Sequence, residues 1–374
     1  MKRVVKSIYA PTRYVFVADR FSNFISVTDI VSGEHVETLD FSMRPHVMEL
    51  ARDDAMLAVG SPEVSAIEFM NLRTRERRRV ELPSPVFQLF FVPQTNLVAV
   101  GLRDQVGMIS YKDFSVRIFP RRFDSDQRQT LINTYYSLLF SSFSQSFWVL
   151  DEDRPFIYHR YGGAEPLDAP WKTIDLSRHI GSGSGLGIGV ASPEDDLLAM
   201  TTDDGSEGLV YFPAQDKVLS TGPMRTVGST NEPMIMPYID AYSKHVIFAD
   251  MEGNVALFDL VNGNGKPERF TVKFSPRFIR TGWLESTWIL AGDKGIMFQS
   301  FKDPSDRKVV RFVPEVMNMW VTGDSKTALY TLDEGAPTIY RFDIRTREPL
   351  PPIRVRGVTV ASMLRMGSNN SICY

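Results

Sequence analysis

The sequence predicts an all-β fold, a closed β-propeller of four-stranded antiparallel blades, with eight blades favoured and seven as the alternative. Three features recur in the same order: a hairpin of short apolar strands, a polar turn that leads into an outer strand, and a proline that opens the next innermost strand. Repeats of about 40–50 residues are typical of radial arrays in which each repeat forms one small sheet. We therefore expect residues 1–374 to form a single propeller domain.

The hairpin strands are apolar at consecutive positions, as expected of sheets that neighbouring blades cover on both faces. Each first strand ends on Asp or Gly, and the steps between these equivalent residues are 41, 41, 50, 52, 47, 42 and 41 residues. The equivalent residues are Asp19, Gly60, Gly101, Asp151, Asp203, Asp250, Gly292 and Asp333. Eight hairpins indicate eight blades, and seven would remain if one irregular middle repeat formed no sheet.

The turn after the hairpin begins with Asp or Asn in several repeats, and alternating polar residues follow it, which is typical of a solvent-facing outer strand. These turns begin at Asp29, Asn71, Asp259 and Asp343. A proline then precedes the strand expected to be innermost, at Pro45, Pro85, Pro233, Pro276 and Pro314. The segment from Val358 to Arg365 lacks a blade of its own. It is predicted to be the innermost strand of the first blade, and so to close the ring.

Two segments lengthen the spacing in the middle of the chain and are expected to be inserted loops, at about residues 120–134 and 162–185. Neither shows the 3.6-residue hydrophobic period that would indicate a helix. Between Gly181 and Gly189, glycine occupies every second position. A dinucleotide-binding glycine loop would need a strand before it and a helix after it. We interpret this run instead as an innermost strand kept bare where blades crowd together.

Composition argues against several classes of function. The formal net charge of −3 disfavours broad electrostatic binding of nucleic acid or an anionic membrane. The one cysteine, Cys373, allows no intramolecular disulfide and no thiolate metal site. No stretch of about 18 apolar residues occurs, so no membrane span is expected. The opening MKRVVKSIYAPTR has no apolar run of leader length. This predicts a cytoplasmic protein, or a periplasmic one if a leader has been removed.

The residues that could carry chemistry form no recognisable catalytic or metal site, so no cofactor is predicted. A metal site needs two or three converging ligands, and the five histidines are scattered through different repeats. Acidic pairs fall in predicted hairpin turns, where Asp accepts hydrogen bonds from backbone N–H groups. The basic run from Arg73 to Arg79 is interpreted as a solvated blade edge, with a docking patch for an acidic partner as the alternative.

From Tyr14 to Leu50, the segments YVFVAD, ISVTD, IVSGE and RPHVMEL follow one another in order. They resemble the YVTN-type propeller repeat. The wider group includes the large subunits of quinoprotein amine dehydrogenases and the haem-binding propeller of dissimilatory nitrite reductases. The resemblance is architectural and covers essentially the whole chain. For the amine dehydrogenases it implies a companion subunit, because their quinone lies in a different chain. No CxxCH motif for covalent haem is present here.

Ligands of propellers usually meet the mouth of the central channel, where the loops that open the innermost strands converge. By repeat position, six residues are predicted to form an entrance ring there: Arg44, His46, Glu232, Arg277, Glu315 and Arg356. Their mixed charge suits a protein partner or a small anionic molecule. His46 could also act as an axial ligand or an acid–base group. Histidine is frequent at this position in non-catalytic copies of the repeat, which favours a structural role.

The sequence therefore predicts a non-catalytic interaction scaffold or accessory subunit that binds a protein partner at the entrance ring. The alternative is a redox or hydrolytic enzyme, most plausibly an amine-dehydrogenase-like companion subunit, with its site at the central channel.

Overall fold

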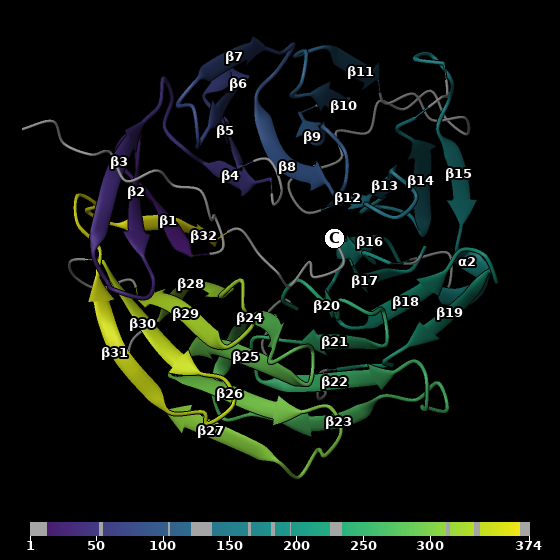
Figure 1. The fold of residues 1–374 in the computed structure, drawn as a ribbon. Helices are drawn as coiled ribbons and strands as arrows, with labels where there is room; N and C mark the ends of the chain where they lie inside the picture. The colour runs from purple at the N-terminus through teal and green to yellow at the C-terminus, as the bar shows by residue number, and fades with distance from the viewer. Residues whose placement is uncertain are drawn as a thin grey trace, which may run out of the picture.

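The computed structural model describes residues 13–51, 55–103, 105–120, 137–163, 166–180, 184–194, 196–224, 234–311, 315–332 and 337–366. Within these ranges the strands form eight four-stranded antiparallel sheets, arranged around one axis as an eight-bladed propeller (Figure 1). Eight blades, not seven, are therefore present, and the all-β prediction is confirmed.

Each blade is numbered here by the order of its hairpin in the chain, and its strands are given from the axis outward. Blade 1 consists of β32 (Ala361–Met366), β1 (Tyr14–Asp19), β2 (Phe24–Asp29) and β3 (His35–Asp40), and blade 2 of β4 (Val47–Leu50), β5 (Met56–Ser61), β6 (Val64–Asn71) and β7 (Arg77–Glu81). Blade 3 consists of β8 (Val86–Val92), β9 (Leu97–Leu102), β10 (Gln105–Ser110) and β11 (Val116–Pro120), and blade 4 of β12 (Leu138–Ser141), β13 (Ser146–Leu150), β14 (Phe156–Tyr161) and β15 (Lys172–Asp175). Blade 5 consists of β16 (Leu186–Ala191), β17 (Leu198–Thr202), β18 (Gly208–Phe212) and β19 (Lys217–Ser220), and blade 6 of β20 (Tyr238–Ile239), β21 (His245–Ala249), β22 (Asn254–Asp259) and β23 (Glu268–Thr271). Blade 7 consists of β24 (Ser275–Gly282), β25 (Thr287–Asp293), β26 (Gly295–Ser300) and β27 (Arg307–Arg311), and blade 8 of β28 (Val316–Val321), β29 (Thr327–Leu332), β30 (Thr338–Asp343) and β31 (Pro349–Arg354).

The ring is closed by β32, which pairs with β1 although the two strands lie at opposite ends of the chain. The antiparallel register places Val15 opposite Met366 and Ala18 opposite Met363. In Figure 1 the yellow strand β32 accordingly lies beside the purple strand β1. The prediction that the segment ending at Arg365 completes the first blade is confirmed.

The core lies between the blades, because the middle strands are buried on both faces. Strands β1 and β2 are buried at every position after the first, whereas the outer strand β7 exposes four of its five side chains. Between blades 2 and 3, for example, Phe69 packs with Val100 in one cluster of buried residues. The consecutive apolar residues of the sequence are therefore explained by packing on two sides.

Turn aspartates bind the backbone of their own turns, as predicted. The Asp29 Oδ1 atom accepts hydrogen bonds from the backbone N–H groups of Val31 and Ser32, at 2.9 and 3.3 Å. Asp250 Oδ1 likewise accepts from the N–H groups of Glu252 and Asn254, at 3.0 and 2.8 Å. These carboxylates are engaged in local structure, which is why acidic residues recur at equivalent positions.

The predicted insertion at 162–185 is only partly a loop. It contains β15, the outermost strand of blade 4, followed by the short helix α2 (Ser177–Ile180). Trp171 is fully buried just before β15, and its Nε1–H donates to the carbonyl of Pro120 at 3.0 Å. The spacing lengthened because the outer strand is delayed, not because it is missing. Most of the other expected insertion, at about residues 120–134, lies outside the described residues.

The last two glycines of the run, Gly187 and Gly189, lie in β16 and are needed for space. A Cβ atom on Gly187 would lie 2.5 Å from Thr201 Oγ1, and one on Gly189 would lie 2.8 Å from the Ala199 carbonyl oxygen. Real Cβ contacts are longer than this, so a larger residue would push the strand away from β17. Crowding was the interpretation preferred from the sequence, but the shortest contacts are to β17 of the same blade and not to a neighbouring blade.

Basic side chains link neighbouring blades along the outer rim. The Arg347 guanidinium binds Asp306 through two 2.5 Å contacts, from blade 8 to blade 7. Arg75 reaches Glu37 of blade 1 at 2.5 Å, and Arg117 donates to the Gly163 carbonyl of blade 4 at 2.7 Å. The basic run at 73–79 therefore lies on a blade edge, as interpreted from the sequence.

Candidate functional site

The entrance ring is assembled only in part. Arg277 Nε and Nη2 contact the two carboxylate oxygens of Asp293 at 2.9 and 3.1 Å, and the same guanidinium forms an ion pair with Glu315 of the next blade. The hydrogen bond to Asp293 is the main cause that raises the pKa of Arg277. Two predicted ring residues, Arg277 and Glu315, thus meet, but their charges already neutralise each other.

The blade 2 members of the ring are also engaged. Arg44 forms an ion pair with Glu63, on the turn between β5 and β6. The His46 backbone N–H donates to the Gly60 carbonyl at 2.9 Å, and its side chain is exposed. Desolvation and the nearby Arg44 charge lower the pKa of the His46 imidazole.

The remaining two predicted residues do not join this group. Glu232 lies outside the described residues. Arg356 lies in the crossover between β31 and β32, where its backbone carbonyl accepts a 2.8 Å hydrogen bond from Ser26 Oγ of β2. Its side chain lines a pocket with Arg341 and Arg354 at the outer part of blades 8 and 1. Arg356 forms no ion pair or hydrogen bond with the other described residues of the entrance ring.

A different polar group lies on the innermost strands of four consecutive blades, and we call it the axial cluster. Its members are Arg280 of β24, Trp320 of β28, Arg365 of β32 and Glu49 of β4. The Arg280 and Arg365 guanidiniums lie 5.3 and 4.7 Å from the centre of the Trp320 ring. Arg365 Nε also contacts Glu49 Oε1 at 3.1 Å. All four side chains are half-buried.

Charge in the axial cluster is unbalanced. Arg365 has Glu49 as its carboxylate, whereas Arg280 forms no ion pair with any described residue and donates to the carbonyl of its own neighbour, Ile279, at 2.7 Å. Burial lowers the pKa of Arg280, and the Arg365 charge lowers it further, although Tyr238 and Glu49 oppose this. An arginine remains protonated even so. The cluster therefore carries two cations and one anion.

The innermost strands of blades 3 and 4, β8 and β12, carry aromatic side chains. Blades 3 and 4 face blades 7 and 8 across the axis (Figure 1). Phe90 of β8 and Phe140 of β12 stack with their ring centres 5.8 Å apart. Both rings belong to the core between blades 3 and 4, where Phe140 is buried.

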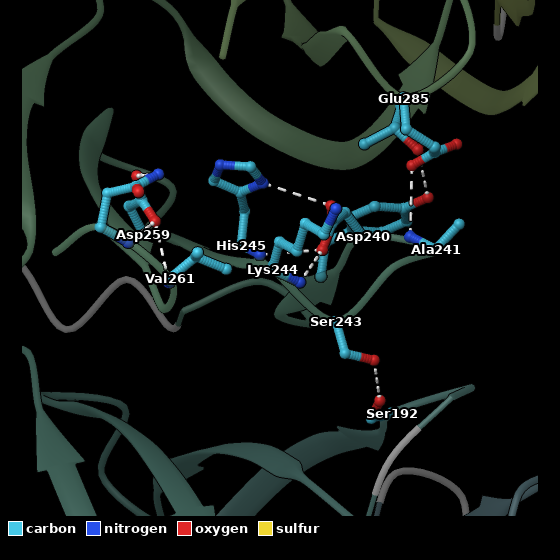
Figure 2. A network of polar contacts seen from close by, with 12 residues as sticks. Ser192, Asp240, Ala241, Ser243, Lys244, His245, Asp259, Val261 and Glu285 are labelled. Carbon is cyan, nitrogen blue, oxygen red and sulfur yellow. Dashed lines mark hydrogen bonds and ion pairs between the residues drawn. The ribbon is translucent and has the colours of Figure 1, made fainter. Parts of the chain in front are cut away.

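A second polar network connects the turns that follow the innermost strands β16, β20 and β24 (Figure 2). Asp240 is almost fully buried and accepts from the backbone N–H of Lys244 at 2.6 Å and from His245 Nδ1 at 3.2 Å. Glu285 of blade 7 accepts from the Ala241 N–H at 3.2 Å. Burial is the main cause that raises the pKa of Glu285, and the Asp240 charge adds to it.

This network joins blades 5, 6 and 7, since Ser192 of blade 5 also hydrogen-bonds Ser243 of blade 6. Its carboxylates accept hydrogen bonds from backbone donors, which indicates a structural role.

In the described part of the chain, no group of three or more His, Cys, Asp or Glu side chains is placed to hold a metal ion. No helix among the described residues is long and apolar enough to cross a membrane.

Sequence reasoning did not single out the axial cluster, although a signal was present. Glu49 and Arg365 interrupt the apolar inner strands VMEL and ASMLRM. A charge inside an otherwise apolar strand is the informative exception in a repeat, because such strands are normally buried. The three charged members come from repeats far apart in the chain, so only the closed ring brings them together.

Comparison with solved structures agrees with this fold. Dihydro-heme d1 dehydrogenase NirN in complex with DHE is similar over 96% of this chain and 76% of its own, with a TM-score of 0.71 and 14% sequence identity. Apo AztD from Citrobacter koseri is similar over 95% of this chain and 99% of its own, with a TM-score of 0.59 and 9% identity. At these identities the similarity shows the fold alone. No protein-family model and no curated protein sequence matches the chain.

Proposed function

We propose that this protein is a non-catalytic binding propeller whose ligand is an organic anion with an apolar body, held near the axis by Arg280 and Arg365. The observation that carries this proposal is the unbalanced charge of the axial cluster, in which two guanidiniums flank Trp320 and only one carboxylate is present. A half-buried cation without a counter-charge is costly to keep. A bound anion would supply the missing charge.

The surroundings favour an amphipathic ligand over a simple ion. The arginines offer charge-assisted hydrogen bonds, which are about twice as strong as neutral ones. The Trp320 ring between them offers aromatic surface. Pockets for organic ligands commonly combine apolar walls with a few convergent polar groups. The ligand class that fits both the arginine charges and the aromatic surface is an aromatic or aliphatic carboxylate, sulfonate or phosphonate.

Binding, and not catalysis, is proposed because the axial cluster offers no nucleophile with a base beside it. Glu49, its only carboxylate, is occupied by Arg365 at 3.1 Å. A general base must be within hydrogen-bond reach of the proton that it removes and free to accept it. The alternative of a redox or hydrolytic enzyme gains no specific observation from the described residues.

Two finer expectations also belong to this proposal. The repeat is assigned to the YVTN-type group on the segments from Tyr14 to Leu50, and NirN, whose solved structure contains DHE, supports a propeller of this shape as a ligand-binding scaffold. A protein partner at the entrance ring remains a prediction. Arg277, a member of that ring, would have to exchange Asp293 or Glu315 for the partner's carboxylate.

The axial site can be tested with 8-anilinonaphthalene-1-sulfonate, an aromatic anion whose fluorescence reports binding. We expect Arg280→Gln and Arg365→Gln each to weaken its affinity by about 10- to 100-fold, the usual effect of losing a charged hydrogen bond. Arg280→Lys keeps the charge and should lose less.

Arg77→Gln is the matched control, because it removes the same charge from the exposed outer strand β7. It should leave the affinity unchanged. Equal affinities for the wild type and both axial variants, with all proteins folded by circular dichroism, would contradict the proposed function.

A further inference from the structure

A pocket of about 340 Å³ lies at the seam where the last blade meets the first, and we call it the seam pocket. It lies outside the axial cluster and shares no residue with it. One wall is the turn between β2 and β3, and the other is formed by β30, β31 and the crossover toward β32. The lining residues are Val31, Ser32, Gly33, Arg341, Pro351, Pro352, Ile353, Arg354 and Arg356.

Three arginines line the seam pocket, and none of its lining residues is acidic. Arg354 and Arg356 are exposed, and neither guanidinium forms an ion pair or hydrogen bond with a described residue. Of the two carboxylates that flank this turn, Asp29 is bound to Arg13 at 2.7 Å, and the exposed Glu34 is not among the residues that line the pocket. The pocket therefore carries a local charge of three cations in a protein whose formal net charge is −3.

Arg341 is held in a fixed position at the back of this pocket. Its Nη1 donates to the Ile30 carbonyl at 2.9 Å, and its Nε and Nη2 donate to the Pro351 carbonyl at 2.8 and 2.6 Å. A guanidinium has five N–H donors, so two remain. The bonds orient the group without neutralising it, because the acceptors are carbonyl oxygens and not carboxylates.

The turn opposite contributes a hydroxyl group. Ser32 Oγ accepts a hydrogen bond from the Glu34 N–H at 3.3 Å, which leaves its own O–H free to donate. The backbone N–H groups of Val31 and Ser32 are used by Asp29. The available donors are thus the arginine side chains and one hydroxyl. This donor set suits a compact ion with several oxygens.

We propose that the seam pocket binds the phosphate group of a small phosphorylated molecule, or phosphate itself. Arginine matches phosphate because its planar N–H pairs can form two parallel hydrogen bonds to two oxygens. A phosphate monoester carries a charge of about −1.5 to −2 at neutral pH, which offsets most of the three cations. A carboxylate would offset only one of them and leave the pocket charged.

Binding at this place has a consequence for the ring. The two walls come from residues 31–33 and 341–356, which belong to blades at opposite ends of the chain. Arg341 already reaches across to the Ile30 carbonyl, and Ser26 reaches back to the Arg356 carbonyl. A phosphate bound between Ser32 and Arg354 would add a further bridge. The ligand is therefore expected to stabilise the closed ring as well as to occupy the pocket.

The experiment is thermal unfolding of the full chain with phosphate or phosphoserine, against chloride at the same ionic strength so that general screening cancels. We expect the midpoint of the wild type to rise by about 2 °C or more at saturation. The double variant Arg354→Gln with Arg356→Gln should not respond. Both residues are exposed, so the variant is expected to fold.

The matched control is Arg77→Gln with Arg79→Gln, which removes the same charge from an exposed outer strand and should respond like the wild type. Hydrogen exchange adds a local measurement, since phosphate should slow exchange in β32 and β1 of the wild type. A stronger response to phosphoserine than to phosphate would assign a phosphate ester, and the reverse order would assign the free ion. No response of the wild type beyond that to chloride, or an equal response of the double variant, would overturn the proposal.

Discussion

The arginines of the outer rim and those beside the axis have opposite surroundings. On the rim, Arg347 binds both carboxylate oxygens of Asp306, and the guanidinium of Arg160 donates to the carbonyls of Pro166 and Ala169. Beside the axis, Arg280 and Arg365 share a tryptophan ring and a single carboxylate. A guanidinium whose donors are satisfied within the fold stabilises the fold. The two guanidiniums beside the axis share one carboxylate, which is the reason that we propose a bound anion there.

The largest effect is expected from opening the ring, on which both regions depend. A chain that ends at Gly357 lacks β32 and exposes the free edge of β1. It also loses Arg365 of the axial cluster. We expect a fall in the thermal midpoint of more than about 10 °C, or failure to fold, because an unpaired edge exposes a whole ladder of backbone groups. An unchanged midpoint would mean that the ring closes in another way.

Arg160 should show how strongly one rim arginine stabilises the fold. It is 1% exposed, its guanidinium lies 4.7 Å from the centre of the Phe119 ring, and its removal would take one donor from each of two carbonyls, of which that of Pro166 would keep the Ala169 N–H. We expect Arg160→Ala to lower the free energy of unfolding by about 3–5 kcal/mol. Chemical denaturation measures this. A loss below about 1 kcal/mol would place Arg160 with the exposed rim arginines.

The rim also contains a buried histidine that should make stability depend on pH. Burial lowers the pKa of His159 to about 4, and its Nε2 has no hydrogen-bond partner in the described structure. The unfolded chain binds the proton near pH 6.5 and the folded chain does so only near pH 4. Stability should therefore fall as the pH drops through this interval, by up to about 3 kcal/mol.

Replacing this histidine isolates its share of the acid sensitivity. His159→Gln should flatten the dependence between pH 6.5 and pH 4, as measured by denaturation at several pH values. His35→Gln is the control, because its imidazole is only half-buried and is perturbed less. The same slope in the wild type and in His159→Gln would show that other groups govern the acid transition.

The smallest expected effect is a change in the free energy of unfolding whose sign should differ between a rim arginine and an axial arginine. Arg347→Gln should lower the free energy of unfolding by about 0.5–1 kcal/mol, since it breaks a partly exposed pair with good geometry. Arg280→Gln should leave stability unchanged or raise it slightly, because burial and Arg365 both oppose its charge. Thermal unfolding without ligand distinguishes these outcomes. A larger loss in Arg280→Gln than in Arg347→Gln would assign Arg280 to the structure and not to binding.

The blades could be predicted from sequence because each repeat carries its own turn chemistry. Asp29 and Asp259 start the same turn in different blades, and the same hydrogen bonds follow. Closure by the segment ending at Arg365 was predictable for a related reason, as a leftover strand in a ring has one vacant position. These inferences needed only local geometry and the rule that a propeller leaves no long free edge.

The entrance ring was predicted by using repeat position as a guide to spatial position, and two of its described members, Arg277 and Glu315, form an ion pair. His46 is the last residue before β4, whereas Arg356 is the second of the residues that join β31 to β32. A residue so early in the crossover is still close to the outer strand, and Arg356 accordingly lines the seam pocket. The axial cluster was missed because Arg280 and Arg365 meet only through packing between blades.

The pairing of β1 with β32 also sets the order of events during synthesis. More than three hundred residues separate Asp40, where the first three strands of blade 1 end, from Ala361, where β32 begins. At about 5–20 residues per second, the first blade waits for tens of seconds with three strands and a bare inner edge. Until β32 leaves the ribosome, that edge is open to any strand nearby, so a growing chain is the form of this protein most exposed to mispairing and most in need of a chaperone.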